Sequence, residues 1–153
     1  MKPLLVYTDV SVIGGCEDVE FSLDSLALWK RFVEGRYILV VSVHALRELA
    51  GAPGPVRARL QEVPEGHRIL LPDSPEALTL AAAYLERGIV GPGSKEDALH
   101  VALATVGRVD VLVSWNFKHI VNLGKIRHFN AVNIELGYGT VEIRTPKEVM
   151  DDA

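Results

Sequence analysis

The sequence predicts an α/β fold with a largely parallel central sheet. Short runs rich in Val, Ile and Leu alternate with segments of helical periodicity, which is typical of strand–helix–strand crossover units. Residues 37–41, for example, are too few and too β-branched for a helix, and they are apolar on both faces, as expected for a strand covered by helices on two sides. A chain of 153 residues has the length of one domain, so we expect residues 1–153 to form a single one.

The predicted strands are bounded by glycine, proline or polar residues. The first follows Pro3, and the second follows Gly35, which suits the end of a preceding helix. The strands are expected at residues 4–8, 37–41, 68–71, 111–114 and 141–143.

Serines mark the expected starts of several helices, because their hydroxyls accept hydrogen bonds from free backbone N–H groups. Ser74 is followed by Pro75 and Glu76, both favoured in a first helical turn. Residues around Gly14 and Gly15 are expected to form a loop. Helices are expected from Ser22 to Gly35 with a core face of Leu26, Leu28, Trp29, Phe32 and Val33, from Ser42 to residue 49, over 56–63, from Ser74 to Gly88, from Lys95 to Gly107, and over 118–137 with a break at Gly124.

Composition and charge limit the classes of function. Hydrophobic residues make up 48% of the chain and charged residues 24%, which is ordinary for a globular protein and argues against disorder. The net charge of −4 excludes a global basic field that would hold nucleic acid by counterion release alone. Any contact with nucleic acid is therefore expected to be local.

The cysteine content and the apolar runs predict a cytoplasmic protein. A single cysteine, Cys16, cannot form an internal disulfide, which fits a reducing compartment. The first residues pass directly into a predicted strand and lack the pattern of a signal peptide. No apolar run reaches the roughly 18 residues that span a bilayer, so no membrane contact is expected.

Asp9, Glu48, Asp97 and Asn116 each stand where a predicted strand passes into a helix, or on the helix that follows. The carboxyl ends of parallel strands meet at one edge of a sheet, where open α/β folds bind ligands. Carboxylates gathered there repel each other, and a hard cation such as Mg²⁺ or Mn²⁺ relieves that repulsion with oxygen ligands. Such an ion can polarise a phosphate, stabilise charge on the leaving oxygen and deprotonate a water. The pattern therefore indicates a phosphodiester hydrolase.

Each of these residues also has a structural interpretation. Asp9 can cap the loop that follows, Glu48 can be a solvated helix residue, Asp97 can be a favourable charge in a first helical turn, and Asn116 can be a turn residue. His44 and Glu48 are four residues apart and share a helix face, which allows a histidine–carboxylate metal pair. A zinc site, however, needs more ligands than this spacing supplies. We interpret His100 as a buried core histidine with satisfied hydrogen bonds.

Four segments together resemble the PIN-domain nucleases, and in particular their toxin-like, VapC-type branch. They are Tyr-Thr-Asp-Val-Ser at 7–11, Leu-Arg-Glu-Leu at 46–49, Lys-Glu-Asp-Ala-Leu-His-Val-Ala at 95–102 and Val-Ser-Trp-Asn-Phe-Lys-His at 113–119. The resemblance covers nearly the whole chain. It implies a three-layer α/β/α sandwich with a mostly parallel central sheet, and a metal-dependent ribonuclease with Asp9, Glu48 and Asp97 as the acidic ligands of Mg²⁺ or Mn²⁺.

The resemblance also bears on the fourth motif and on partners. Ser114 and Asn116 match that motif, but many members have aspartate where this chain has Asn116, which removes a charge and favours a weaker site or a single ion. Relatives of this kind commonly form homodimers and are blocked by an antitoxin protein. The candidate contacts to an RNA substrate are Ser114, Lys118, His119, Thr8 and Ser11.

Three other functions compete with the nuclease. A PIN-like RNA- or protein-binding regulatory module with weakened catalysis is suggested by Asn116. A haloacid-dehalogenase-type phosphotransferase also begins with a strand that ends in aspartate, but it needs a second aspartate where this chain has Ser11. A phosphate-binding loop at residues 91–94 is disfavoured because no lysine follows at the required spacing.

Overall fold

The fold is built on a five-stranded sheet in the order β3-β2-β1-β4-β5, with every neighbouring pair parallel. The computed structural model describes residues 2–151. The predicted α/β class is confirmed, and the longest strand lies second from the edge while β1 lies at the centre. The strands are β1 Leu4–Thr8, β2 Tyr37–Ser42, β3 Arg68–Leu71, β4 Val111–Val113 and β5 Ile143–Arg144.

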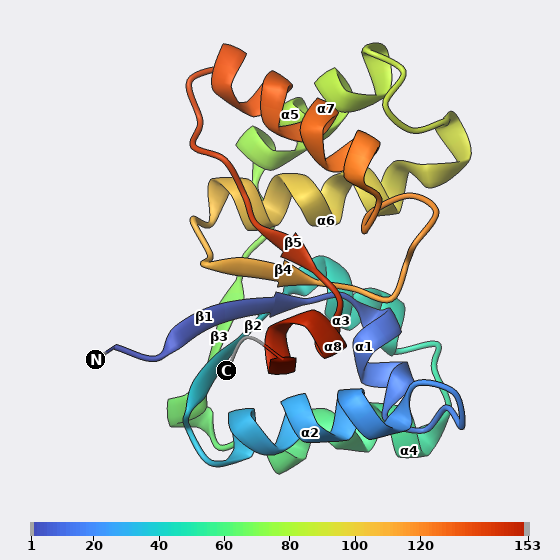
Figure 1. Cartoon of the computed structure of the whole chain (residues 1–153), viewed down its shortest axis with the longest axis vertical. Helices are drawn as coiled ribbons and strands as arrows, with labels where there is room; N and C mark the ends of the chain where they lie inside the picture. The colour runs from blue at the N-terminus through green and yellow to red at the C-terminus, as the bar shows by residue number, and fades with distance from the viewer. Residues whose placement is uncertain (1, 152–153) are drawn as a thin grey trace.

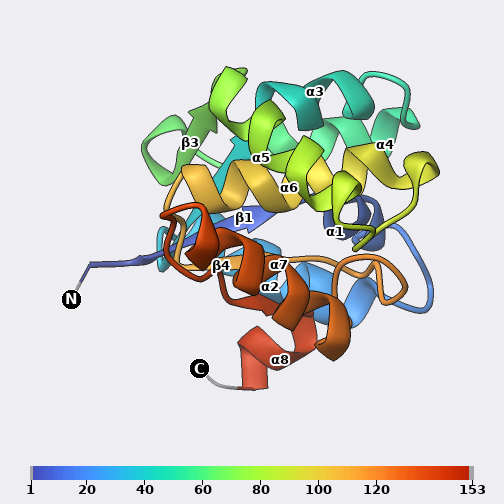
Figure 2. The same cartoon turned by 90° about the horizontal axis from the view of Figure 1, so that it is seen from above.

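Helices cover both faces of the sheet, which gives the three-layer arrangement visible in Figure 1. One layer holds α5 Pro75–Glu86, α6 Lys95–Val106 and α7 Leu123–Glu135, and α5 lies over α6 in the view from above (Figure 2). The opposite layer holds α1 Val10–Gly15, α2 Ser22–Val33, α3 Val43–Leu49, α4 Gly54–Ala58 and α8 Pro146–Asp151. None of the helices within residues 2–151 is long and apolar enough to cross a membrane.

The two cores follow from the alternation of side chains along the strands. Tyr7, Val40 and Leu112 pack in the core beneath α5, α6 and α7. Val6 and Leu39 pack in the other core, beneath α1, α2 and α4. All five side chains are at most 1% exposed, so the central strands are apolar on both faces, as the sequence predicted.

Residues 10–15 form helix α1, and the predicted loop there was wrong. Gly15 closes this helix at a position where only hydrogen fits, because a Cβ atom would lie 2.5 Å from Ser25 Oγ and 2.9 Å from Trp115 Nε1. The two glycines were interpreted as loop formers. Gly15 instead permits the close packing of α1 against α2 and Trp115.

Two other helical segments differ from the prediction. The expected helix over 56–63 is a short helix, α4, followed by the 3₁₀ turn Arg59–Glu62. The expected helix over 118–137 begins only at Leu123, where Asn122 Oδ1 accepts a hydrogen bond from Lys125 N at 3.3 Å. Gly124 therefore lies in the first turn and does not break the helix. The last strand is Ile143–Arg144 rather than 141–143, and α8 was not predicted.

The predicted caps and core face of the helices are mostly confirmed. Ser42 and Ser74 each accept a hydrogen bond from the backbone three residues later, both at 3.0 Å, whereas Ser22 is the first residue of α2 and not its cap. Leu28, Trp29 and Phe32 are buried in α2, but Leu26 and Val33 are 39% and 38% exposed. The buried face of α2 includes Ser25 instead. Ser25 was not predicted there, because a serine does not belong to the apolar pattern of the sequence.

The cores predict a clear difference between two leucines on the sheet. Leu112 is 0% exposed in β4, whereas Leu70 on the edge strand β3 is 52% exposed. We expect Leu112→Ala to lower the free energy of unfolding by about 3 kcal/mol, since it removes buried methyl groups and leaves a cavity. We expect Leu70→Ala to change it by less than about 0.5 kcal/mol. Urea denaturation followed by circular dichroism measures both, and equal losses would contradict this description of the core.

Candidate functional site

The candidate site lies at the carboxyl ends of β1 and β4. These neighbouring strands are in register with Thr8 opposite Val113, so the residues that follow each strand, Asp9 and Ser114, emerge side by side. In Figure 1 the arrowhead of β1 points toward α1. Asp9 is the single residue between the end of β1 at Thr8 and the start of α1 at Val10. The edge of the sheet therefore brings together residues that are 105 positions apart in the chain.

Asp9 is a buried carboxylate held by two serines. Its side chain accepts a hydrogen bond from Ser11 Oγ at 2.5 Å on Oδ1 and from Ser114 Oγ at 2.6 Å on Oδ2, and the residue is only 5% exposed. It occupies the cap position of α1 but makes no capping hydrogen bond with its side chain. No ion pair joins Asp9 to a basic residue within residues 2–151. Its charge is thus stabilised by hydroxyl groups alone.

Asp97 lies in the first turn of α6 and faces the same site. Its Oδ1 accepts a hydrogen bond from Asn116 Nδ2 at 3.0 Å. Burial raises the pKa of the Asp97 carboxyl above its usual value, and the negative charge of Asp9 adds to this effect. His119, His100 and the Asn116 hydrogen bond act in the opposite direction without cancelling the increase. Asp9 and Asp97 therefore repel each other across the site.

Asn116 acts both as a turn residue and as a link between elements. Its backbone N–H donates to Ser114 Oγ at 2.9 Å, and its Oδ1 accepts from His119 N at 2.9 Å. Its Nδ2 donates to Asp97 at the same time. The structural interpretation of Asn116 is thus correct in part, and the amide also fixes the position of one carboxylate of the site.

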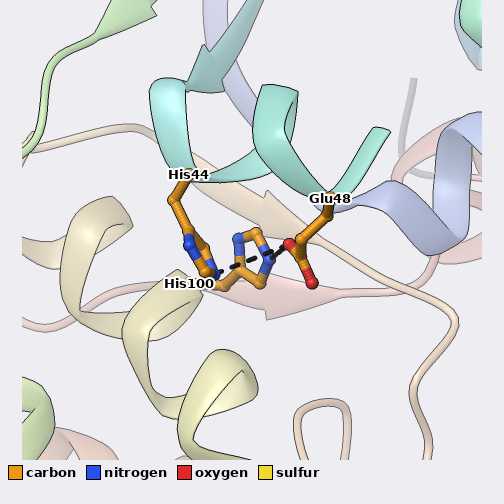
Figure 3. A group of neighbouring side chains, drawn as sticks. All are labelled: His44, Glu48 and His100. Atoms are coloured by element: carbon orange, nitrogen blue, oxygen red, sulfur yellow. Dashed lines mark hydrogen bonds and ion pairs between the residues drawn. The ribbon is translucent and has the colours of Figure 1, made fainter. Parts of the chain in front are cut away.

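Glu48 is directed toward two histidines. Its Oε1 lies 2.6 Å from His100 Nε2 and 3.6 Å from His44 Nε2, as Figure 3 shows. Burial would raise the pKa of the Glu48 carboxyl, but the hydrogen bond from His100 and the charges of His100 and His44 outweigh it and lower that pKa. The sequence predicted that four side chains would supply ligands to one ion. In the structure Glu48 forms its ion pairs with His44 and His100. Asp9 instead accepts hydrogen bonds from Ser11 and Ser114, and Asp97 accepts one from Asn116.

His100 connects these two groups of side chains. It is 3% exposed and hydrogen bonded at both ring nitrogens, so its interpretation as a satisfied buried histidine was correct. Its Nδ1 lies 2.7 Å from the hydroxyl of Tyr7, which lies 2.8 Å from Ser42 Oγ. The contact of His100 with Glu48 was not predicted from the sequence, although the position of His100 one helical turn after Asp97 indicates that both side chains face the same way.

The predicted substrate contacts fall into different environments. Lys118 is exposed, and His119 is half-buried. The hydroxyls of Ser11 and Ser114 donate hydrogen bonds to the Asp9 carboxylate. Thr8 is 0% exposed, and its Oγ1 has no hydrogen-bond partner in the described part of the chain. The burial of Thr8 removes the reason for assigning it a contact with substrate.

Comparisons with solved structures agree with this architecture. A chain of the VapBC2 structure from Rickettsia felis, bound to a DNA fragment from its promoter, aligns at a TM-score of 0.59 with 10% identity, over 93% of this chain and 98% of that one. The sarcin-ricin loop cleaving toxin VapC20 of Mycobacterium tuberculosis aligns at 0.57 with 14% identity, over 89% and 98%. FitAcB from Neisseria gonorrhoeae aligns at 0.57 with 15% identity, over 92% and 97%. This chain has the PIN-domain fold.

The PIN fold is thus established by shape. No known family profile matches the sequence, and no curated protein matches it either. Within this fold Asp9 follows the central strand, Asp97 begins α6, and Ser114 and Asn116 follow β4, in the order of the motifs that carry the resemblance. Asp9 and Asp97 offer oxygen atoms only, and Asp9 lacks a basic partner among the described residues. This donor set fits a hard divalent cation such as Mg²⁺ or Mn²⁺.

The burial of Asp97, together with the repulsion from Asp9, predicts a stability effect that depends on pH. A carboxyl whose pKa is raised by folding destabilises the folded state when it is ionised in both states, so the penalty is full at neutral pH and disappears as the pH falls through the folded-state pKa toward the usual 3.8. We expect Asp97→Asn to raise the Tm of the metal-free protein at pH 7 and to leave it nearly unchanged near pH 4. Thermal unfolding in the presence of a chelator measures this.

Glu96→Gln is the matched control for the Asp97 variant. Glu96 lies in the same first turn of α6 but is exposed, so its substitution reports the loss of a favourable charge at a helix start without the burial. We expect this control to leave the Tm unchanged or slightly lower. If Asp97→Asn lowers the Tm as much as the control does at both pH values, the proposed destabilisation by the charge of Asp97 is contradicted.

Proposed function

We propose that this chain is a Mg²⁺- or Mn²⁺-dependent ribonuclease that hydrolyses RNA phosphodiester bonds and acts as the toxin of a toxin–antitoxin pair. The observation that carries the proposal is the Asp9 carboxylate, which is 5% exposed at the end of the central strand and adjoins a second carboxylate, Asp97, whose pKa is raised by burial and, to a smaller degree, by the charge of Asp9. Neither carboxylate forms an ion pair with a lysine or arginine among the described residues, so the two destabilise the protein unless a cation or a proton compensates them.

The structural neighbours support the choice of substrate and partner. VapC20 of Mycobacterium tuberculosis is a toxin that cleaves the sarcin-ricin loop, and VapBC2 of Rickettsia felis is a complex bound to promoter DNA. On this basis we propose an RNA substrate and an antitoxin protein as inhibitor. We also propose a homodimer, from the resemblance of the motifs, and a cytoplasmic location, which fits the single cysteine. The resemblance of the motifs supports the same assignment.

Each residue of the site has a distinct role in this proposal. Ser11 and Ser114 orient the two oxygens of Asp9, and Asn116 orients Asp97, so the carboxylates are positioned before an ion arrives. Asp9 and Asp97 would hold the ion, with Glu48 as a third carboxylate. An ion held there would supply Lewis-acid polarisation of a phosphate oxygen and an acidified water.

Residues that follow Asn116 are placed to contact the RNA. Lys118 is exposed and supplies a local positive charge for a phosphate, which a chain of net charge −4 requires. Phe117 is 52% exposed, and its ring centroid lies 6.0 Å from that of Trp115, which is stacked on Phe21 at 4.4 Å. The exposed ring gives a base a surface on which to stack.

Asp9→Asn tests the proposal directly. We expect RNA cleavage in Mn²⁺ to fall by about 100-fold or more, because the variant loses the charge that holds the ion at the centre of the site. The amide keeps one hydrogen-bonding oxygen, so we expect the far-ultraviolet circular dichroism to be unchanged. Initial rates on a fluorescently labelled RNA measure the effect, with Glu96→Gln as a control for the loss of an acidic charge nearby. Cleavage by Asp9→Asn at the parent rate would rule out the assignment.

Asn116→Asp separates the nuclease from the weakened binding module. Both ends of the Asn116 side chain are engaged in hydrogen bonds, which is the observation that favours a structural role for this amide. The substitution places a further carboxylate beside Asp97, where Asn116 Nδ2 now lies 3.0 Å from Asp97 Oδ1. For a nuclease we expect measurable cleavage by the parent, tighter Mn²⁺ binding by the variant in calorimetry and a lower Tm without metal. Cleavage by the variant alone would favour the weakened module.

A further inference from the structure

The cluster of His44, Glu48 and His100 lies beside the carboxylate site and differs from it in chemistry. Each of these residues offers one ligand atom, and the three atoms lie within 4.8 Å of one another. We propose that His44, Glu48 and His100 form a second cation site, specific for zinc and similar borderline transition-metal ions. The inference concerns binding of the metal alone and does not depend on the nuclease activity.

The backbone places the three side chains around one point. His44 and Glu48 lie one turn apart on α3, and His100 reaches them from α6 (Figure 3). Ligand atoms about 2.0–2.1 Å from a tetrahedral zinc ion are about 3.3 Å apart. The distance from His44 Nε2 to Glu48 Oε1 is 3.6 Å, close to that value. The hydrogen-bonded pair of His100 Nε2 and Glu48 Oε1 is 2.6 Å apart and opens slightly when the ion replaces the proton between them.

His44 gives an independent indication of a missing partner. Its Nε2 is buried from solvent and has no hydrogen-bond partner within residues 2–151. Buried polar atoms without a partner are rare, and an ion accounts for this one. The Glu48 side chain is 33% exposed and leaves the ion access to the site.

Tyr7 and Ser42 orient His100 from its other side. The ring nitrogen Nδ1 lies 2.7 Å from the Tyr7 hydroxyl, and that hydroxyl lies 2.8 Å from Ser42 Oγ. A hydroxyl can donate or accept, so Nδ1–H can donate to Tyr7 while Tyr7 donates to Ser42. When an ion replaces the proton that His100 Nε2 shares with Glu48, Nδ1 keeps its hydrogen toward Tyr7 and Nε2 offers its lone pair to the metal. Histidine ligands of metal sites are usually held by such a second hydrogen bond.

The donor types select the ion. Two imidazole nitrogens and one carboxylate oxygen suit Zn²⁺ or Co²⁺, and a fourth position remains for water. Mg²⁺ prefers oxygen ligands only, as in the pair Asp9 and Asp97. The chain therefore carries two adjoining donor sets of opposite preference.

Titration of Co²⁺ into the metal-free full-length protein tests the site, because nitrogen-ligated tetrahedral or five-coordinate Co²⁺ absorbs visible light far more strongly than hydrated Co²⁺. We expect a visible band in the parent that saturates at one equivalent and is removed by one equivalent of Zn²⁺. We expect His44→Gln to weaken Co²⁺ binding by at least about 100-fold, since it removes a direct ligand. Asp97→Asn distinguishes the two sites: a band that persists assigns Co²⁺ to the histidine cluster, whereas a band that is lost assigns it to the carboxylates and would overturn the proposal.

The Asp97→Asn control keeps this inference separate from the proposed nuclease. Its band survives whether or not the protein cleaves RNA, so failure of one proposal does not decide the other. A second measurement on the parent needs no variant: in long-range ¹H–¹⁵N spectra, Zn²⁺ should shift the imidazole nitrogens of His44 and His100 first. Absence of a Co²⁺ band in the parent, a band unaffected by His44→Gln, or Zn²⁺ shifts confined to other histidines would each overturn the proposal.

Discussion

The site depends on the position of β1 at the centre of an all-parallel sheet. Because β1 has strand neighbours on both sides and helices on both faces, the residue that follows it is buried, and Asp9 is that residue. A charge at this point cannot be stabilised by bulk water. It is stabilised by hydroxyls from α1 and from the end of β4, and these contacts fix how the two segments meet.

Helix α6 supplies the second half of the arrangement. Asp97 and His100 are one turn apart on it, so a single helix faces both the carboxylates and the histidine cluster. The two environments have opposite effects on acidity. Burial and Asp9 raise the pKa of the Asp97 carboxyl, whereas Glu48, despite its burial, has a lowered pKa because of its two imidazole neighbours. Glu48 thus has imidazole partners that favour its charge, whereas burial and Asp9 disfavour the charge on Asp97.

Asn116, which makes three hydrogen bonds, places an amide where an acidic residue would place a negative charge. Its amide donates to Asp97, caps the backbone at His119 and bonds through its own N–H to Ser114. A carboxylate could not donate to Asp97 and would add a third negative charge. The amide therefore attracts a cation less strongly than a carboxylate would, but it holds Asp97 in a defined position.

The sequence by itself determined the α/β class, the placement of the motifs at the ends of predicted strands and the burial of the central strands. Short β-branched apolar runs indicate local conformation and burial on two faces directly. It also identified Asp9, Asp97 and Asn116 at the sheet edge. Helix α1 was missed because Gly15 reflects a close contact with Ser25 and Trp115, which are distant in sequence. The burial of Thr8 and the pairing of Glu48 with His100 were decided only by the tertiary structure, since Thr8 is covered only when the layers assemble and the pairing needs α3 to lie beside α6. Local patterns fix which residues reach an edge of the sheet, and only packing decides which of them touch.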